Sequence, residues 1–255
     1  MNDFTFDERT HKYFLDGKPM TGVTTVLGVI NKPALVAWSA KMACEYVREN
    51  LRDLADLERV LELAKGAHNR FRDKAADAGT DVHAECEKYI NLMIADQAGI
   101  AHTINDDTLN VQVKAFIEWA VQNKIKFLAS EKRVYSVKHF TAGTLDFACE
   151  IEGIKYIGDI KTTSGIYDRT PFAQTAAYQM MWAEQEGKEP SEIAERRIIV
   201  NLKKTGTFDP EKDVYISQHY EDDIELFMSA LTMYRNVGRF EPLSYQKSNK
   251  RIIKI

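Results

Sequence analysis

The sequence predicts an α/β fold in which a mixed central sheet is flanked by helices. The first observation is a change of period, because apolar residues recur at helical spacing between Pro33 and residue 122, and three consecutive strand-like segments follow from residue 131. The second is the order of elements from residue 80, which is helix, three strands, helix and strand; elements in this order pack as a mixed sheet with helices on its faces. The third is composition: 255 residues, 44% hydrophobic and 28% charged, are enough for one large domain or two small ones.

The N-terminal part of the chain is predicted to combine strands with helices. Residues 4–15 are strand-like and are followed by the turn signal Asp16-Gly17. Helical spacing of apolar residues then begins at Pro33 and continues to residue 65. These patterns predict an N-terminal hairpin and a helical elaboration over residues 1–78.

Two further helices are predicted before the strands begin. The first starts at Gly79 and Thr80, with Thr80 as a reasonable N-cap. Its apolar stripe consists of Val82, Cys86, Tyr89 and Met93. The second helix covers residues 109–122 and also carries its apolar residues at helical spacing.

The central and C-terminal segments predict the strands of the sheet. Three strand candidates joined by short turns cover residues 131–137, 143–151 and 154–161. A helix follows from Pro171, since proline suits the first turn of a helix, and a strand covers residues 196–202. A hairpin partner and an amphipathic helix over residues 220–236 come last. With no repeat or linker, we predict one domain over residues 1–255, with its core at 79–202 and a C-terminal hairpin, helix and tail at 203–255.

Bulk properties exclude several classes of protein. The net charge of −4 gives no overall attraction to nucleic acid or to anionic membranes. No segment approaches the roughly 18 apolar residues of a membrane span, and the N-terminus lacks the apolar core of a signal peptide. The three cysteines lie far apart without a CxxC pair, which argues against a disulfide framework, a zinc site or an iron–sulfur cluster. We therefore expect a cytoplasmic protein with no membrane partner.

Two carboxylates interrupt the predicted strand pair around the turn at Glu152-Gly153. Asp146 and Asp159 each lie about six positions from this turn, so the register sets them opposite each other. Adjacent carboxylates repel, and they take up either a proton or a cation. A hard ion such as Mg²⁺ prefers oxygen ligands, and Lys161 projects from the same face as Asp159. The pattern therefore indicates a metal site with a neighbouring ammonium group.

The alternating pattern of the strand also assigns its apolar residues to faces. Leu145, Phe147 and Cys149 are expected on one face, and Asp146 on the other. A second interpretation of the charges remains open on the pattern alone. Asp146 and Lys161 would then form a cross-strand ion pair, with Asp159 solvated at the strand end.

Four short motifs give the chain a resemblance to a known family. They are GTDVH at residues 79–83, GTLD at 143–146, DIK at 159–161 and QTAAY at 174–178. In this order they resemble the RecB-like branch of the PD-(D/E)XK nuclease superfamily, which has a restriction-endonuclease-like core. The segment HKYFLDGKPMTGVTTVL at residues 11–27 is similar to the opening of phage-encoded exonucleases and of the mitochondrial genome-maintenance exonuclease group. Leu145 replaces the family's usual proline, and the cysteine cluster of its iron–sulfur members is missing.

The resemblance implies a role for each matching residue. It makes Asp146 and Asp159 acidic metal ligands and Lys161 the catalytic lysine. It adds the backbone carbonyl of Ile160 and the side chain of His83 as metal ligands, with Mg²⁺ or Mn²⁺ as the ion. The remaining residues that it implies, which steady the lysine and the substrate backbone, are Gln174 and Tyr178.

The resemblance also implies a function. It predicts a metal-dependent DNA exonuclease that hydrolyses phosphodiester bonds in recombination, replication or repair, in a phage or bacterial setting. Its substrate would be DNA with a free end, and a single-strand-annealing or replication protein is left open as a partner. Two alternatives stay open on the sequence: a structure-specific endonuclease, and a non-catalytic nucleic-acid-binding recombination factor that retains the nuclease fold.

Overall fold

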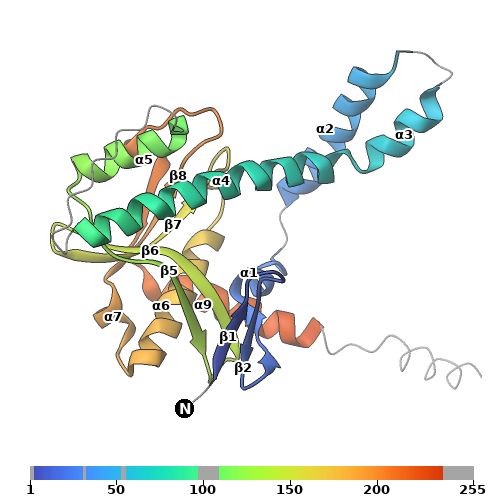
Figure 1. Cartoon of the computed structure of the whole chain (residues 1–255). Coiled ribbons are helices and arrows are strands. Elements are labelled where there is room, and N and C mark those ends of the chain that lie inside the picture. The colour runs from blue at the N-terminus through green and yellow to red at the C-terminus, as the bar shows by residue number, and fades with distance from the viewer. Residues whose placement is uncertain (1–2, 31–32, 53–55, 97–108, 238–255) are drawn as a thin grey trace, which may run out of the picture.

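A small antiparallel sheet forms the N-terminus of the protein. The computed structural model describes residues 3–30, 33–52, 56–96 and 109–237 (Figure 1). The small sheet contains β1 (Phe4–Asp7), β2 (Lys12–Leu15) and β3 (Lys18–Pro19). The strand-like segment over residues 4–15 therefore contains two strands, β1 and β2, which pair with each other. The predicted turn is confirmed, because Asp16 and Gly17 have φ angles of 49° and 73°, which an Asp-Gly turn of this kind requires.

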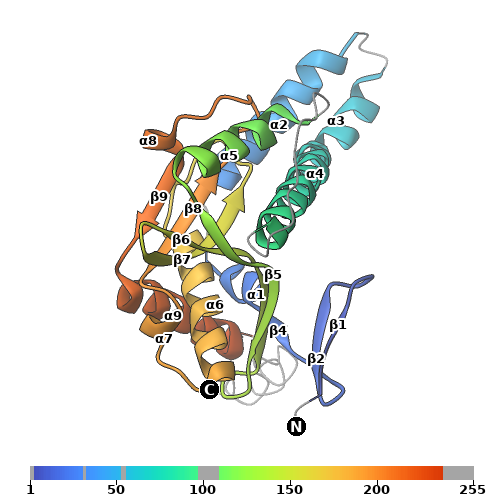
Figure 2. The ribbon, with the colours of Figure 1, turned by 60° about the vertical axis from the view of Figure 1, so that its left-hand side comes forward.

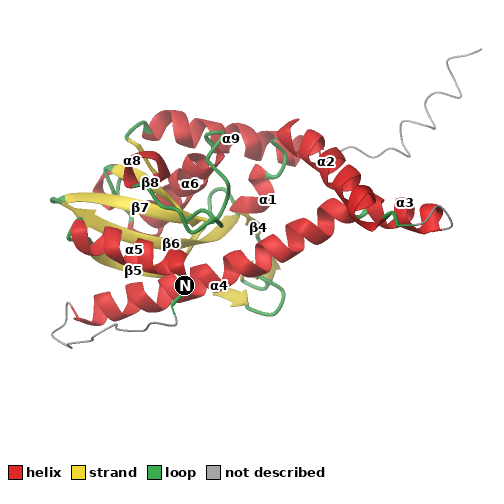
Figure 3. Ribbon diagram, turned by 90° about the horizontal axis from the view of Figure 1, so that it is seen from above, coloured by secondary structure: helices red, strands yellow, loops and turns green. Residues whose placement is uncertain are grey.

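Four helices follow within the described residues of the N-terminal half. They are α1 (Val23–Leu27), α2 (Pro33–Asn50), α3 (Leu57–Lys65) and α4 (Ala67–Asp96). Helices α2 and α3 pack on each other and on the first half of α4, and together they extend away from the central sheet (Figures 1 and 3). No helix in the described ranges is both long enough and apolar enough to cross a membrane.

The predicted helix start at Thr80 is wrong, because α4 runs through residues 79 and 80 without a break. Gly79 has a packing role instead. A Cβ atom at this position would lie 2.8 Å from the Oγ1 atom of Thr162, which follows the lysine strand. The glycine therefore allows α4 to approach the end of that strand closely, and it does not mark a boundary between two helices.

The main sheet is mixed, as the sequence predicts. Within the described ranges it has six strands, β4 (Thr21–Gly22), β5 (Lys126–Ser136), β6 (Thr141–Ile151), β7 (Ile154–Lys161), β8 (Arg196–Asn201) and β9 (Val214–Ser217). The pairs β4–β6 and β7–β8 are parallel, and the other pairs are antiparallel. The predicted boundaries of β7 are confirmed, and the predicted hairpin partner of β8 is β9.

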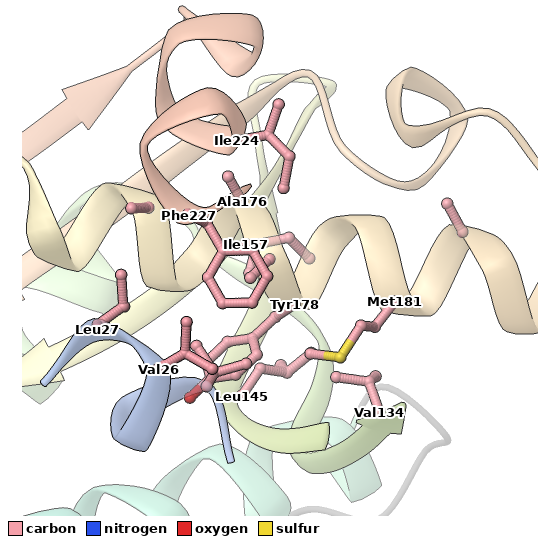
Figure 4. Packing of buried hydrophobic residues seen from close by; sticks show 14 of the residues in the cluster. Val26, Leu27, Val134, Leu145, Ile157, Ala176, Tyr178, Met181, Ile224 and Phe227 are labelled. Atoms are coloured by element: carbon pink, nitrogen blue, oxygen red, sulfur yellow. The ribbon is translucent and has the colours of Figure 1, made fainter. Parts of the chain in front are cut away.

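Helices cover both faces of this sheet (Figures 2 and 3). The later helices are α5 (Val111–Gln122), α6 (Thr170–Glu186), α7 (Pro190–Ile193), α8 (Pro210–Asp213) and α9 (Tyr220–Val237). On one face α1, α6, α7 and α9 bury an apolar cluster with the sheet, part of which Figure 4 shows. On the other face α4 and α5 bury a second cluster. The predicted α/β class is therefore confirmed.

One edge of β6 is left open in its middle. Strand β5 pairs along one edge of β6 over most of its length, so β4 and β7 share the opposite edge. On that edge β4 pairs with Thr141 and Ala142, and β7 pairs from Phe147 onward. Among the described strands, none pairs with residues 143–146 there. The strands β4 and β7 thus pair with opposite ends of this edge, and the GTLD segment lies in the gap between them.

The alternation of β6 also breaks at this segment, and the predicted grouping of its apolar residues is wrong. Leu145 lies in the cluster with α6 and α9, whereas Phe147 and Cys149 lie in the cluster with α4 and α5. The ladder register sets Glu131 of β5 opposite Asp146, and Glu131 has a φ of 44°, in the left-handed region. A strand that is irregular at one position does not keep the two-residue period on both sides of it.

Candidate active site

A pocket of about 260 Å³ opens at the gap along β6. Six of the residues predicted from the four motifs line it, namely His83, Asp146, Asp159, Lys161, Gln174 and Tyr178. Ile160, whose backbone carbonyl was also predicted as a metal ligand, is not among the lining residues, and its side chain is buried in the cluster with α4 and α5. The six lining residues come from α4, β6, β7 and α6, so both faces of the sheet contribute to one site (Figure 1). The structure thus brings these six side chains together.

Asp146 occupies the point where β6 and β7 separate. The regular ladder between these strands ends at Phe147 and Gly158, and the next pair in register would be Asp146 and Asp159, as predicted. A carboxylate oxygen of Asp146 accepts a hydrogen bond of 2.7 Å from the backbone N–H of Ile160. The side chain replaces the missing partner strand, because a buried N–H without an acceptor would be costly.

Asp159 and Lys161 form a close ion pair at the end of β7. The Nζ atom of Lys161 lies 2.6 Å from the Oδ2 atom of Asp159. The Asp159 side chain is only 1% exposed, whereas that of Lys161 is 25% exposed. The alternative in which Asp159 is solvated and Lys161 pairs with Asp146 is therefore wrong.

Burial governs the ionisation of the two acids. It raises the pKa of Asp159 to about 6, and Asp146 adds to this rise while Lys161 opposes it. Burial also raises the pKa of Asp146, against the effects of Lys161 and of the Ile160 N–H. For Lys161, burial acts to lower the pKa, but Asp159 and Asp146 outweigh it and the pKa rises. The ammonium group therefore stays charged while the carboxylates favour any added cation.

Gln174 connects the ion pair to α6. Its Nε2 atom donates to Asp159 Oδ1 at 3.0 Å and to the Tyr178 hydroxyl at 3.0 Å. Its Oε1 atom accepts from Lys161 Nζ at 3.4 Å. Tyr178 is buried among apolar side chains (Figure 4). Its ring lies against Gly143 of β6, where a Cβ atom would be 2.4 Å from Tyr178 Cε1. The two helix residues thus fix the positions of the acid and the lysine.

His83 completes the site from the other face of the sheet. Its Nδ1 atom lies 3.4 Å from the Oδ2 atom of Asp146, and its side chain is 33% exposed. Burial lowers the pKa of His83, and Asp159 and a backbone hydrogen bond with Ile160 act against this effect. The ring is therefore neutral near pH 7, which is the form that binds metal ions.

The donor set suits a hard divalent ion. No three His, Cys, Asp or Glu side chains in the described ranges form a ready metal-binding group. Mg²⁺, however, is commonly held by one or two carboxylates and keeps several waters, so two acids facing an open pocket are sufficient. Asp146 and Asp159 are raised in pKa by burial, and a cation would offset their charge. The residues present therefore fit Mg²⁺ or Mn²⁺.

Sequence reasoning missed the part of the site that comes from the N-terminus. Tyr13 of β2 and Thr24 of α1 line the pocket, as does Thr144 in the gap of β6. Tyr13 and Thr24 lie within residues 11–27, and the resemblance expected for this segment gave no role to single residues. Nothing in the local pattern indicates that a separate sheet would reach the acids.

Comparison with known proteins adds no assignment. No protein-family model matches the chain, and no curated protein matches it significantly. The fold and the site define an α/β protein with an acidic, lysine-containing pocket at a gap in its mixed sheet. Any more specific function has to be argued from this geometry and from the four motifs.

Proposed function

We propose that the protein is a divalent-metal-dependent deoxyribonuclease with a restriction-endonuclease-like, PD-(D/E)XK core. The observation that carries this proposal is the convergence of residues from four separate motifs on one pocket. A protein that only bound nucleic acid would gain nothing from two acids that are buried next to each other, because their mutual repulsion is costly. The acids, the lysine and the open pocket together suit the hydrolysis of a phosphodiester.

Each polar group in the pocket has a distinct task in this proposal. Asp146 and Asp159, with the backbone carbonyl of Ile160 and with His83, would hold Mg²⁺ or Mn²⁺, which supplies a water of lowered pKa and offsets charge on the phosphate. Lys161 stays protonated and stabilises the negative charge that develops on the phosphate, or orients the attacking water. Gln174 keeps Asp159 and Lys161 in place, and Tyr178 holds Gln174.

The proposed activity is exonucleolytic, on DNA with a free end. The similarity of residues 11–27 to the opening of phage-encoded exonucleases supports this choice over a structure-specific endonuclease. Such an activity serves recombination, replication or repair, and a single-strand-annealing or replication protein is the kind of partner that it would have. The proposal makes the site independent of base sequence, because its groups address the phosphate and not the base edges.

The experiment measures cleavage of end-labelled linear DNA in Mg²⁺ or Mn²⁺, with EDTA as the blank. We expect Asp146→Asn, Asp159→Asn and Lys161→Ala each to lower kcat by roughly a hundredfold or more, because each removes a group that acts on the transition state. Glu150→Gln and Lys155→Ala change an acid and a lysine on the same two strands outside the pocket, and they should keep wild-type activity. A closed circular substrate should stay intact.

Two results would count against the proposal. Wild-type rates in all three purified pocket variants would refute the assignment of the site. Cleavage that continues unchanged in EDTA would refute the metal requirement. Cleavage of the closed circle would be consistent with the nuclease site, but it would show that the activity is endonucleolytic.

A further inference from the structure

The N-terminal sheet contributes a tyrosine to the pocket. Tyr13 lies on β2, which belongs to the small sheet and not to the main one, yet it lines the same pocket as Asp146 and Lys161. Its ring is held by neighbours, with the centroid of Phe6 at 4.8 Å and that of Phe4 at 6.2 Å. The half-buried side chain is therefore fixed in position before any ligand arrives.

The hydroxyl group of Tyr13 meets a second hydroxyl in the gap of β6. The oxygen atoms of Tyr13 and Thr144 lie 2.9 Å apart and form a hydrogen bond across 131 residues of sequence. Each hydroxyl has one proton to donate, and their mutual bond uses one of the two. Among the described residues, neither hydroxyl has another hydrogen-bond partner, so the pair keeps one donor for a ligand in the pocket.

The charges in the pocket explain why a neutral donor is useful there. Of the described residues that line it, Lys161 alone carries a permanent positive charge, and that charge lies 2.6 Å from Asp159. A phosphodiester is an anion that must approach two carboxylates. Tyrosine and threonine hydroxyls are common donors to phosphate oxygens in complexes with DNA, and they bind without regard to base sequence.

We propose that Tyr13 and Thr144 form a hydroxyl pair that binds a non-bridging phosphate oxygen of the DNA strand and so sets the position of the strand in the pocket. This inference rests on the proposed nuclease function and deepens it. The pair is a binding element, distinct from the acids and the lysine. The hydrogen bond from the pair stabilises the bound substrate and the transition state equally. Its loss therefore changes KM more than kcat.

The test compares steady-state cleavage of a single-stranded oligonucleotide by Tyr13→Phe, Thr144→Val and the wild type. Each variant should raise KM by roughly tenfold, because the remaining hydroxyl loses the partner that holds it in position to donate to the phosphate, while kcat stays within about twofold. Tyr135→Phe is the matched control. Tyr135 stacks on Phe4 in the same aromatic cluster, with ring centroids 4.3 Å apart, but it does not line the pocket.

A binding measurement separates this inference from the proposed function. Fluorescence anisotropy with the same labelled oligonucleotide is run in a Lys161→Ala background, which keeps both carboxylates, with and without Tyr13→Phe. Weaker binding on adding Tyr13→Phe, together with a wild-type protein that does not cleave, would sustain the hydroxyl pair and refute the nuclease. Active wild type with unchanged KM and Kd in Tyr13→Phe would refute the pair and leave the nuclease standing.

A purely structural role gives a different result. In that case Tyr13→Phe lowers Tm, because the bond to Thr144 anchors the N-terminal sheet, but KM and Kd stay at the wild-type values. That outcome overturns the inference. A rise in KM without a matching fall in Tm, seen in Tyr13→Phe and not in Tyr135→Phe, supports it.

Discussion

At the scale of single residues, the site depends on a few polar groups that have little freedom. The amide of Gln174 contacts Asp159, Lys161 and Tyr178 at once, so its two N–H groups and its oxygen are all used inside the site. Asp146 likewise holds the Ile160 N–H. Side chains whose hydrogen bonds are satisfied in one arrangement keep that arrangement, which is what a site for hydrolysis needs.

The ionisation of Asp159 predicts how stability depends on pH. Its pKa rises from 3.8 to about 6 on folding, so the folded protein without metal binds this proton more tightly than the unfolded chain does. The resulting stability is present below the unfolded pKa and is lost as pH rises through 6. The free energy of unfolding of Asp159→Asn, relative to the wild type, should therefore rise by roughly 3 kcal/mol from about pH 3 to about pH 7.

Urea denaturation in EDTA at a series of pH values measures this difference. Asparagine cannot titrate, so the comparison removes the carboxyl of Asp159 together with its effect on the pKa of His83 and Glu131. Glu150→Gln on the neighbouring strand is the control, and its difference from the wild type should show no such rise. A difference for Asp159→Asn that is flat, or that falls as pH rises, would contradict the raised pKa.

At the scale of elements, the close approach of α6 to β6 controls where Tyr178 and Gln174 lie. A Cβ atom at Gly143 would be 2.4 Å from the Cε1 atom of Tyr178, whose ring is buried and cannot move away. Gly143→Ala should therefore lower the free energy of unfolding by roughly 1–3 kcal/mol through overpacking. The cost should shrink in the double variant with Tyr178→Leu.

Thermal or urea unfolding of the purified variants checks this prediction. Gly22→Ala is a fitting control, because a Cβ atom there would meet only Thr25 Oγ1, at an ordinary distance of 3.6 Å. A stability of Gly143→Ala equal to that of the wild type would show that α6 can shift. The contact between α6 and β6 would then not determine the position of Tyr178.

The elements also show which parts of the fold could be predicted from sequence. Strand β7 was predicted with its observed boundaries, because the turn at Glu152-Gly153 marks its start and the charges of Asp159 and Lys161 mark its end. The start of α4 was predicted wrongly. Gly79 is present because α4 approaches Thr162 closely, and Thr162 is distant in sequence. Local sequence patterns indicate turns and the spacing of apolar residues, but they do not indicate contacts between residues that are distant in sequence.

In the candidate site, too, the residues in local motifs were predicted and those placed by tertiary contacts were not. The acids, the lysine and the residues of α6 were predicted because each lies in a short motif at a strand end or on a helix face. The grouping of Leu145 with Phe147 failed, because the strand is irregular beside Glu131 and alternation assumes a regular one. Tyr13 was missed because its place depends on how the small N-terminal sheet packs against β6.

At the scale of the whole molecule, the pocket lies where several segments that are distant in sequence meet. The N-terminal sheet, α4, the gap between β4 and β7, and α6 each supply a part of it. The overall charge of −4 does not attract DNA, so affinity has to come from this local arrangement and from the ion that it binds. Binding of metal and of substrate are therefore expected to depend on each other.

The most direct measurement of the central claim is a crystal structure of the protein grown with Mn²⁺, in which anomalous scattering locates the ion. We expect one Mn²⁺ in the pocket, coordinated by a carboxylate oxygen from each of Asp146 and Asp159, with Lys161 beside it. A pocket that stays free of Mn²⁺ at saturating concentration, or an ion bound elsewhere while Asp159 remains paired only with Lys161, would contradict it.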